Sequence, residues 1–132
     1  MATGKFGVGV IGCGTVGGGV VKLLVEEAEN LRLKTGVAVE LRKAADIDPA
    51  KRKSTGLPAE RLTENAQEIL DDPEIRVVVE VIGGVKAAST LVEAALTAGK
   101  HVVTANKELL AKKGPDLLAL ARKHNVTLHF EA

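Results

Sequence analysis

The sequence predicts a doubly wound α/β domain built on a mostly parallel sheet of six strands. Short β-branched runs alternate with stretches of helical spacing along the whole chain. Glycine, asparagine and proline separate these runs, as expected for turns. Residues 76–82, RVVVEVI, are almost entirely apolar, which is typical of a strand covered on both faces. Because right-handed crossovers place helices on both faces of such a sheet, the strand order 3-2-1-4-5-6 is expected.

Composition narrows the class of protein further. The 132 residues, 45% hydrophobic and 27% charged, suit one globular domain spanning residues 1–132. No apolar run reaches the roughly 20 residues that span a bilayer, and the N-terminus lacks a secretory signal, so no membrane contact and a cytoplasmic location are expected. With 18 basic and 17 acidic residues and only two aromatic rings, the chain is not expected to bind nucleic acid.

The first elements are read from hydrophobic spacing. Residues 6–11 form a β-rich run that ends in glycines, and residues 16–34 repeat apolar side chains at helical spacing. We therefore expect a strand followed by one long helix. Gly36 suits the end of this helix, because glycine readily adopts left-handed backbone. Residues 37–45 then alternate apolar and polar side chains and predict the second strand.

Cap residues mark the next elements. Asp48 followed by Pro49 is a typical helix start, so a short helix is expected there. Residues 62–63 form a brief third strand in this interpretation. Asn65 then suits the cap of a helix that ends near residue 70.

The second half of the chain continues the alternation of strands and helices. The expected elements are a strand at 76–82, a helix at 87–98, a strand at 101–104, a short helix from Lys107, a further helix opened by Pro115, and a strand at 126–130. Gly99 and Asn125 suit the ends of helices, because both residue types tolerate left-handed backbone.

The glycine run after the first strand carries the clearest chemical signal. Residues 12–17, GCGTVG, have G-x-G-x-x-G spacing, follow a predicted strand and open a predicted helix. Gly12 permits the tight turn, Gly14 lets the backbone approach a pyrophosphate, and Gly17 lets the helix pack closely on the strand. The positive helix N-terminus then receives the phosphates. The sequence thus predicts a Rossmann fold that binds a dinucleotide.

Asp46 ends the second strand, where a carboxylate can hydrogen-bond the adenosine ribose hydroxyls of NAD. The basic run at residues 51–53 could instead pair with the 2′-phosphate of NADP. We therefore expect NAD or NADP as the cofactor, with NAD favoured. The alternative is that Asp46 begins a turn and the basic run is a solvated face.

Lys107 is placed unusually for a helix start. Asn106 suits the N-cap, but a cation in the first turn opposes the helix dipole at a cost of roughly 0.3–1 kcal/mol. Lys107 follows the fifth strand at the same sheet edge as the glycine loop, and Gly83 and Gly84 leave room above the fourth strand for a nicotinamide ring. A lysine there can bind a carbonyl oxygen or transfer a proton as hydride moves, so Lys107 is the candidate catalytic residue. The alternative is a solvent-pointing lysine on a frayed helix end.

The segments VIGCGTVGGGVVKLL, VEVIGG and GKHVVTANKELLA together resemble the N-terminal NAD(P)-binding domain of homoserine dehydrogenase, over essentially the whole chain. The resemblance implies interconversion of L-homoserine and L-aspartate 4-semialdehyde, in the biosynthesis of threonine, methionine and isoleucine. It also implies site residues. The pyrophosphate loop would comprise Gly12, Gly14, Thr15, Val16 and Gly17, and the nicotinamide end Thr104 and Lys107, with Lys107 also at the substrate.

The same resemblance implies parts that lie beyond this chain. The family's substrate and dimerisation domain would follow Ala132, so the chain alone is expected to bind cofactor without completing catalysis, and the full-length protein to be a homo-oligomer. Glu131 matches a glutamate that helps to bind a sodium ion, in a site left incomplete here. Ile47 departs from the family, where many members carry an arginine suited to NADP.

Two other functions remain open from the sequence. One is a non-catalytic nucleotide-sensing module, such as the regulatory domains of potassium transport systems, which also carry a glycine loop on a six-stranded fold. Such a module needs no lysine at the nicotinamide end, and the VTANK segment argues against it. The other is a different NAD(P)-dependent semialdehyde or imine reductase with a similar first domain.

Overall fold

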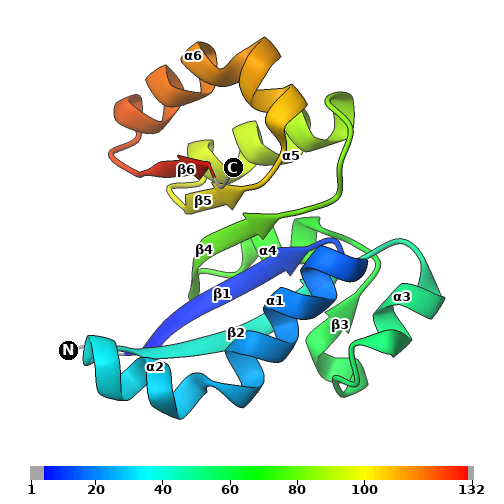
Figure 1. The fold of residues 1–132 in the computed structure, drawn as a ribbon. Coiled ribbons are helices and arrows are strands. Elements are labelled where there is room, and N and C mark those ends of the chain that lie inside the picture. The colour runs from blue at the N-terminus through cyan, green and yellow to red at the C-terminus, as the bar shows by residue number, and fades with distance from the viewer. Residues whose placement is uncertain (1–4, 131–132) are drawn as a thin grey trace.

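The computed structural model of the protein describes residues 5–130. Six strands form a single sheet in the order β3-β2-β1-β4-β5-β6, and every neighbouring pair is parallel (Figure 1). The strands are β1 (Lys5–Ile11), β2 (Ala38–Ala45), β3 (Leu62–Thr63), β4 (Ile75–Glu80), β5 (His101–Thr104) and β6 (Leu128–Phe130). The predicted Rossmann fold and its strand order are therefore confirmed.

Helices cover both faces of the sheet, with α1 in front of it and α4 behind it in Figure 1. They are α1 (Thr15–Glu26), α2 (Ala28–Thr35), α3 (Pro49–Ser54), α4 (Gln67–Asp71), α5 (Lys86–Thr97) and α6 (Lys107–Lys123), with a single 3₁₀ turn, η1 (Ala59–Arg61). Two apolar cores result. Val21 of α1 packs with β1 and β2, and a larger core joins α4, α5 and α6 to the other face. None of these helices is long and apolar enough to cross a membrane.

The prediction of one long helix at residues 16–34 is wrong. The segment forms two helices, α1 and α2, which meet at Glu27, where the backbone leaves helical geometry (φ −105°, ψ 13°). Burial explains the break: α1 buries Gly17 and Val21 against the sheet, whereas α2 buries no residue, so packing does not hold the two helices in line. The predicted end at Gly36 is confirmed, with a left-handed φ of 75°.

The prediction of two separate helices from Lys107 and Pro115 is also wrong. Residues 107–123 form one helix, α6, with Pro115 inside it. Proline normally disfavours helical backbone at the preceding residue because its ring meets that residue's Cβ, but Gly114 has no Cβ. The helix also continues because Leu117 and Ala121, beyond the proline, are buried in the core.

Two strand boundaries differ from the sequence prediction by two residues. Strand β4 ends at Glu80, because the Ile82 N–H donates to the Glu80 carboxylate (2.9 Å). Strand β6 begins at Leu128, because the Val126 N–H still closes α6 through the Ala121 carbonyl. The remaining predicted elements are present within one residue of their expected bounds. The predicted cap at Asn65 is wrong by one residue, because Ala66 is the N-cap of α4, and the Asn65 side chain accepts the Gln67 N–H (3.0 Å).

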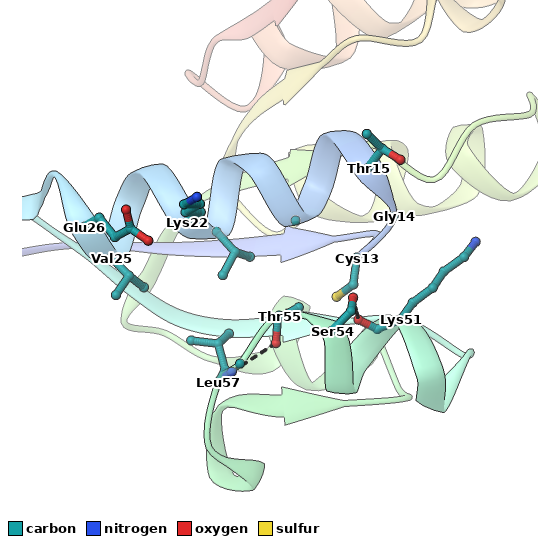
Figure 2. A pocket seen from close by; sticks show the side chains of 13 residues that line it. Cys13, Gly14, Thr15, Lys22, Val25, Glu26, Lys51, Ser54, Thr55 and Leu57 are labelled. Carbon is teal, nitrogen blue, oxygen red and sulfur yellow. Dashed lines mark hydrogen bonds between the residues drawn. The ribbon is translucent and has the colours of Figure 1, made fainter.

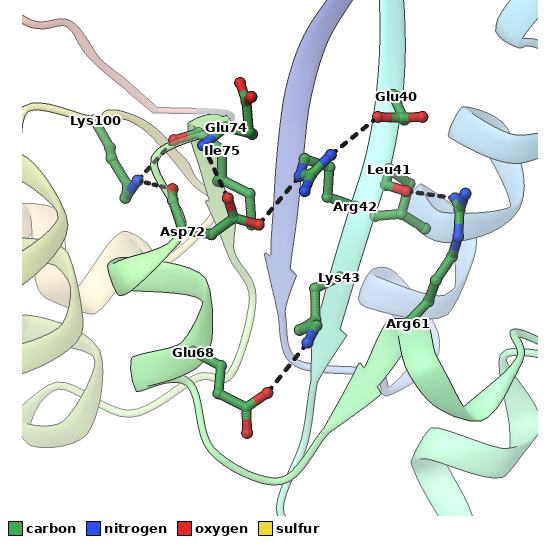
Figure 3. Close-up of polar contacts among 10 residues, drawn as sticks. All are labelled: Glu40, Leu41, Arg42, Lys43, Arg61, Glu68, Asp72, Glu74, Ile75 and Lys100. Carbon is green, nitrogen blue, oxygen red and sulfur yellow. Dashed lines mark hydrogen bonds and ion pairs between the residues drawn. The ribbon is translucent and has the colours of Figure 1, made fainter.

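A polar network secures the sheet near the amino ends of β4 and β5 (Figure 3). Arg42 of β2 donates to the Asp72 carboxylate (3.1 Å), just after α4. Lys100 is only 5% exposed, and its Nζ donates to the Asp72 and Ile75 carbonyls, both at 2.7 Å. Burial lowers the Lys100 pKa, and the Asp72 charge opposes that shift. The network joins β2, α4, β4 and β5 away from the glycine loop.

Candidate functional site

The carboxyl ends of β1, β2, β4 and β5 bring the predicted site residues to one edge of the sheet. Two cavities open there. The first, of about 420 Å³, is here called the Asp46 cavity, and it is lined by Ile11, Gly12, Gly14, Ala45, Asp46, Ile47, Lys51, Glu64, Ala66, Val81, Ile82, Gly83, Ala87 and Leu91. The second, of about 360 Å³, is called the Lys107 cavity, and it is lined by Val16, Glu80, Val81, Gly83, Ala105, Asn106 and Lys107. Val81 and Gly83 border both cavities, so the two adjoin.

The three glycines of the motif have different surroundings. Gly12 has a left-handed φ of 112°, and a Cβ there would lie 2.9 Å from the Val81 backbone. A Cβ on Gly17 would lie 1.7 Å from the Gly12 carbonyl oxygen, so the start of α1 packs directly on the turn. A Cβ on Gly14 would meet no atom within 4 Å, and Gly14 borders the Asp46 cavity. This geometry fits a loop that leaves space for a ligand at Gly14.

Asp46 forms contacts that the sequence analysis missed. Its Oδ2 accepts the Cys13 N–H (2.8 Å) and its Oδ1 accepts the Asp48 N–H (2.9 Å). The carboxylate thus ties the end of β2 to the glycine loop. A carboxylate oxygen can accept more than one hydrogen bond, so both Asp46 oxygens still have capacity for ribose hydroxyls.

The basic run beside Asp46 divides between two roles. Arg52 Nη1 donates to the Asp46 carbonyl (2.6 Å), so its guanidinium stabilises the turn after β2. Lys51 borders the Asp46 cavity instead. Ile47 also borders this cavity and is 84% exposed, which is unusual for a large apolar side chain. With Ala66 and Leu91 it provides apolar surface of the kind that packs on a planar base.

Lys107 is the first residue of α6 and is exposed. Within residues 5–130 its ammonium forms no hydrogen bond or ion pair, so it is available to a ligand in the cavity named after it. The predicted N-cap is confirmed, because the Asn106 side chain accepts the Leu109 N–H (2.9 Å). Val16 of α1 borders the same cavity, near the glycine loop.

Thr104 and Gly84 are not among the residues that line the Lys107 cavity. Thr104 is completely buried, and its hydroxyl donates to Glu80 Oε1 (2.6 Å). The Gly84 carbonyl accepts a hydrogen bond from the Asn106 side chain. Sequence analysis missed Glu80, although a carboxylate in the otherwise apolar RVVVEVI run was a signal, because a buried charge needs hydrogen-bonding partners.

A larger cavity, of about 680 Å³, lies between α1 and α3 and is also bordered by Gly14 (Figure 2). Figure 2 shows the Cys13 side chain directed from the loop toward α3. Burial and the nearby Asp46 charge raise the pKa of the Cys13 thiol, and Arg52 opposes this shift. A neutral buried thiol is not a nucleophile. Val25 and Leu57 give the cavity an apolar wall.

The sodium ligand suggested by resemblance cannot be placed, because Glu131 lies outside the described residues. Across residues 5–130, no three His, Cys, Asp or Glu side chains are grouped so as to hold a metal ion.

Comparison with known sequences places this chain near one group of enzymes. The family described as "Homoserine dehydrogenase, NAD binding domain" matches residues 12–131. The chain is 42% identical over 125 residues to homoserine dehydrogenase of Bacillus subtilis, and the aligned region covers 95% of this chain and 29% of that protein. For the enzyme of Corynebacterium glutamicum the identity is 41% over 126 residues, covering 96% of this chain and 28% of that protein. The chain thus spans less than a third of these relatives.

Solved structures give the same grouping. A homoserine dehydrogenase from Thiobacillus denitrificans superposes with a TM-score of 0.89 at 41% identity, covering 96% of this chain and 29% of that one. GenD2 from gentamicin A biosynthesis, solved in complex with NAD, superposes with a TM-score of 0.74 at 26% identity, covering 96% of this chain and 34% of that one.

Proposed function

The chain belongs to the homoserine dehydrogenase family as its NAD-binding domain, and from this premise we propose that it holds the cofactor of an enzyme that interconverts L-homoserine and L-aspartate 4-semialdehyde. The observation that carries the proposal is the open space at Gly14, between two glycines whose surroundings exclude a side chain. A pyrophosphate at Gly14 lies beside the N-terminus of α1, whose free N–H groups and dipole favour an anion.

The two adjoining cavities give the dinucleotide its direction. The adenosine half fits the Asp46 cavity, where the Asp46 carboxylate meets the ribose and the apolar wall meets the base. The nicotinamide half then fits the Lys107 cavity, which shares Val81 and Gly83 with the first. A route in the opposite direction would bring a flat apolar wall to the reacting ring and leave the lysine beside adenine.

When bound, the nicotinamide supplies hydride transfer. The protein's part in this scheme is to place a polar group beside the reacting carbon. The Lys107 ammonium donates a hydrogen bond to the substrate oxygen and so stabilises the negative charge that grows there as the carbonyl is reduced. In the direction of oxidation, the same nitrogen, as the neutral amine, takes the hydroxyl proton and becomes the ammonium. The Val16 and Val81 side chains give this cavity an apolar border.

We propose NAD as the preferred cofactor. The Asp46 carboxylate would repel a 2′-phosphate, and Ile47 offers it no hydrogen bond or charge. Arg52 already donates to the Asp46 carbonyl, which leaves Lys51 as the member of the basic run that borders the cavity. A single flexible lysine attracts a phosphate but does not offset the adjacent carboxylate, so NADP should bind more weakly than NAD.

The proposal extends to a longer protein. In it, a substrate and dimerisation domain completes catalysis, the enzyme is a cytoplasmic homo-oligomer of threonine, methionine and isoleucine biosynthesis, and Glu131 contributes to a sodium site. The chain alone then binds cofactor but does not oxidise homoserine.

Calorimetric titration of the chain with NAD and NADP, together with a homoserine oxidation assay of the longer protein, tests the proposal. We expect saturable binding with NAD tighter, and NAD-dependent oxidation of homoserine only in the longer protein. Binding of neither dinucleotide would overturn the cofactor assignment. Binding without homoserine oxidation by the longer protein would overturn the substrate assignment alone.

A further inference from the structure

We infer that Glu80 is a positioning residue for the nicotinamide end of the site, and that it acts through Thr104 on the two loops that form the Lys107 cavity. The inference rests on the proposed function and extends it to Glu80, a buried residue at the wall of the Lys107 cavity whose carboxylate is engaged by the protein itself. It is drawn from a buried hydrogen-bond network that joins the loop after β4 to the start of α6.

The Glu80 carboxylate is shared between two strands. Glu80 ends β4, is 0% exposed and pairs in register with Thr104 of β5. Its Oε1 accepts the Thr104 hydroxyl at 2.6 Å, and its Oε2 accepts the Ile82 N–H at 2.9 Å. One carboxylate therefore holds both the end of β5 and the first turn of the loop that follows β4.

Thr104 passes this constraint to the start of α6. Its hydroxyl oxygen accepts the Asn106 N–H at 3.1 Å. A backbone N–H can only donate, so the hydroxyl proton of Thr104 is directed to Glu80 and the polarity of the network is fixed. The Asn106 side chain then accepts the Leu109 N–H and donates to the Gly84 carbonyl. This last bond returns the network to the loop after β4.

The loop that is held in this way has a special backbone. Gly83 and Gly84 both have left-handed φ angles, 78° and 73°, and their loop follows the last residue of β4. Glu80 fixes the start of the loop at Ile82, and Asn106 fixes it again at Gly84. Gly83 and Lys107 border the same cavity from these two loops. The network therefore sets the distance between the cavity wall and the lysine.

Stability alone does not explain a carboxylate at this position. An apolar side chain would fill the end of β4 without the cost of removing a charge from water, and such replacements are often neutral or stabilising. A second Thr-x-Asn turn ends β3, where the Thr63 hydroxyl donates to Glu68 and accepts the Asn65 N–H. The carboxylate of Glu68 is 49% exposed. The turn that ends β3 thus has a half-exposed partner, whereas the turn that ends β5 has a fully buried partner from the neighbouring strand.

The test compares two probes, NADH and ADP-ribose, because ADP-ribose lacks the nicotinamide. Thr104→Val removes the hydroxyl with little change of shape, Thr104→Ser restores it, and Glu80→Gln leaves one acceptor for two donors. Ser89→Ala is the matched control, because the buried Ser89 hydroxyl also donates to a carboxylate, that of Glu93 (2.7 Å), and does not line either cavity.

We expect Thr104→Val and Glu80→Gln each to weaken NADH binding by about tenfold and to change ADP-ribose binding by less than about twofold, which corresponds to one lost hydrogen-bonded constraint. Thr104→Ser should match wild type, and Ser89→Ala should change neither affinity. The variant that carries both Thr104→Val and Glu80→Gln should bind NADH no more weakly than the weaker-binding single variant, because both substitutions remove the same link.

Unchanged NADH affinity in both single variants would overturn the inference. Equal losses of affinity for NADH and ADP-ribose would also overturn it, because they would show a general structural role. Equal affinities of the wild-type chain for the two probes would overturn it as well, because the nicotinamide would then contribute nothing to binding. If Thr104→Val does not fold, the ratio of NADH affinity to ADP-ribose affinity measured for Glu80→Gln, compared with that of wild type, decides between these outcomes. Failure of the wild-type chain to bind either probe would instead overturn the proposed function.

Discussion

The three glycines of the loop after β1 differ in what would surround an added side chain. Gly12 and Gly17 face backbone atoms, so substitution there would distort the fold, whereas Gly14 faces open space. Gly14→Val should therefore leave the domain folded and weaken NAD binding at least about 100-fold, because the side chain would occupy the space of the pyrophosphate. Thermal unfolding and calorimetric titration measure the two effects.

Gly19→Val is the matched control for this variant, because Gly19 also faces open space and borders neither the Asp46 cavity nor the Lys107 cavity. It should bind NAD as wild type does. Undiminished affinity in Gly14→Val would remove the pyrophosphate from the glycine loop.

Asp46 has two functions that one substitution would affect together. Asp46→Ser removes a ribose acceptor and a charge, and it also releases the Cys13 N–H of the glycine loop. We expect NAD binding to weaken, and the ratio of NADP to NAD affinity to rise by about tenfold as the repulsion is lost. Titrations with both cofactors give this ratio. A fall in both affinities with no change of ratio would restrict Asp46 to holding the loop.

Substitution of Lys107 tests its proposed role at the nicotinamide end of the site. Lys107→Ala should leave the fold intact and stabilise it slightly, since a cation at a helix start costs roughly 0.3–1 kcal/mol. In the longer protein the same change should lower kcat by roughly 10²–10⁴-fold, and arginine should not restore it, because a guanidinium does not act as a base. Steady-state kinetics at saturating NAD and homoserine provide the measurement.

Lys112→Ala is the control for Lys107, because Lys112 is an exposed lysine of the same helix, 3.5 Å from Glu108. It should retain full activity. A Lys107→Ala rate within about twofold of wild type would mean that the lysine is only an exposed helix-end residue.

At the scale of elements, the Asp72 carboxylate connects α4 and β4 to β2 through Arg42. Burial raises the pKa of Asp72, but the Glu74 N–H and the Arg42 guanidinium outweigh it and hold the pKa below its usual range. A lowered folded pKa means that the unfolded chain binds the proton more tightly. The contribution to stability is therefore complete above the unfolded pKa, about 3.9, and is lost as the pH falls through the lower folded value.

Asp72→Asn should accordingly lower the free energy of unfolding by a constant amount between about pH 5 and 8, and by progressively less below about pH 4. Urea denaturation across this range measures the difference from wild type. Glu29→Gln, which removes an exposed pair with Arg32, is the control and should have little effect. A difference that stays constant down to about pH 2 would contradict the account, because no proton would then be linked to the contact.

The order and type of most elements could be predicted because their signals are local. Periodicity, caps and glycines marked the strands and most helices. The two errors had different causes, since helical spacing does not tell how far burial extends along a segment, and a proline does not by itself show whether it begins a helix or lies inside one. The pattern continues through Glu27, but the burial that supports α1 stops there, and Pro115 lies within a helix because Gly114 precedes it and the core holds the turns beyond it.

At the scale of the whole molecule, the sequence predicted the parts of the site that lie in one segment, namely the glycine loop and the Asn106 cap. The parts formed by neighbouring strands could not be predicted in detail. The link between Glu80 and Thr104 depends on the register of β4 and β5, and that between Asp46 and Cys13 on the pairing of β1 and β2. Such contacts arise only when the sheet has assembled.

The central claim is that one dinucleotide lies across the Asp46 and Lys107 cavities. Amide chemical-shift mapping of the isotope-labelled chain during an NADH titration tests it most directly. We predict shifts at Gly12, Gly14, Asp46, Gly83 and Lys107, and none at Asp72 or Lys100 at the far edge of the sheet. Shifts confined to the cavity between α1 and α3, at Val25 and Leu57, or no saturable shifts at all, would contradict the claim.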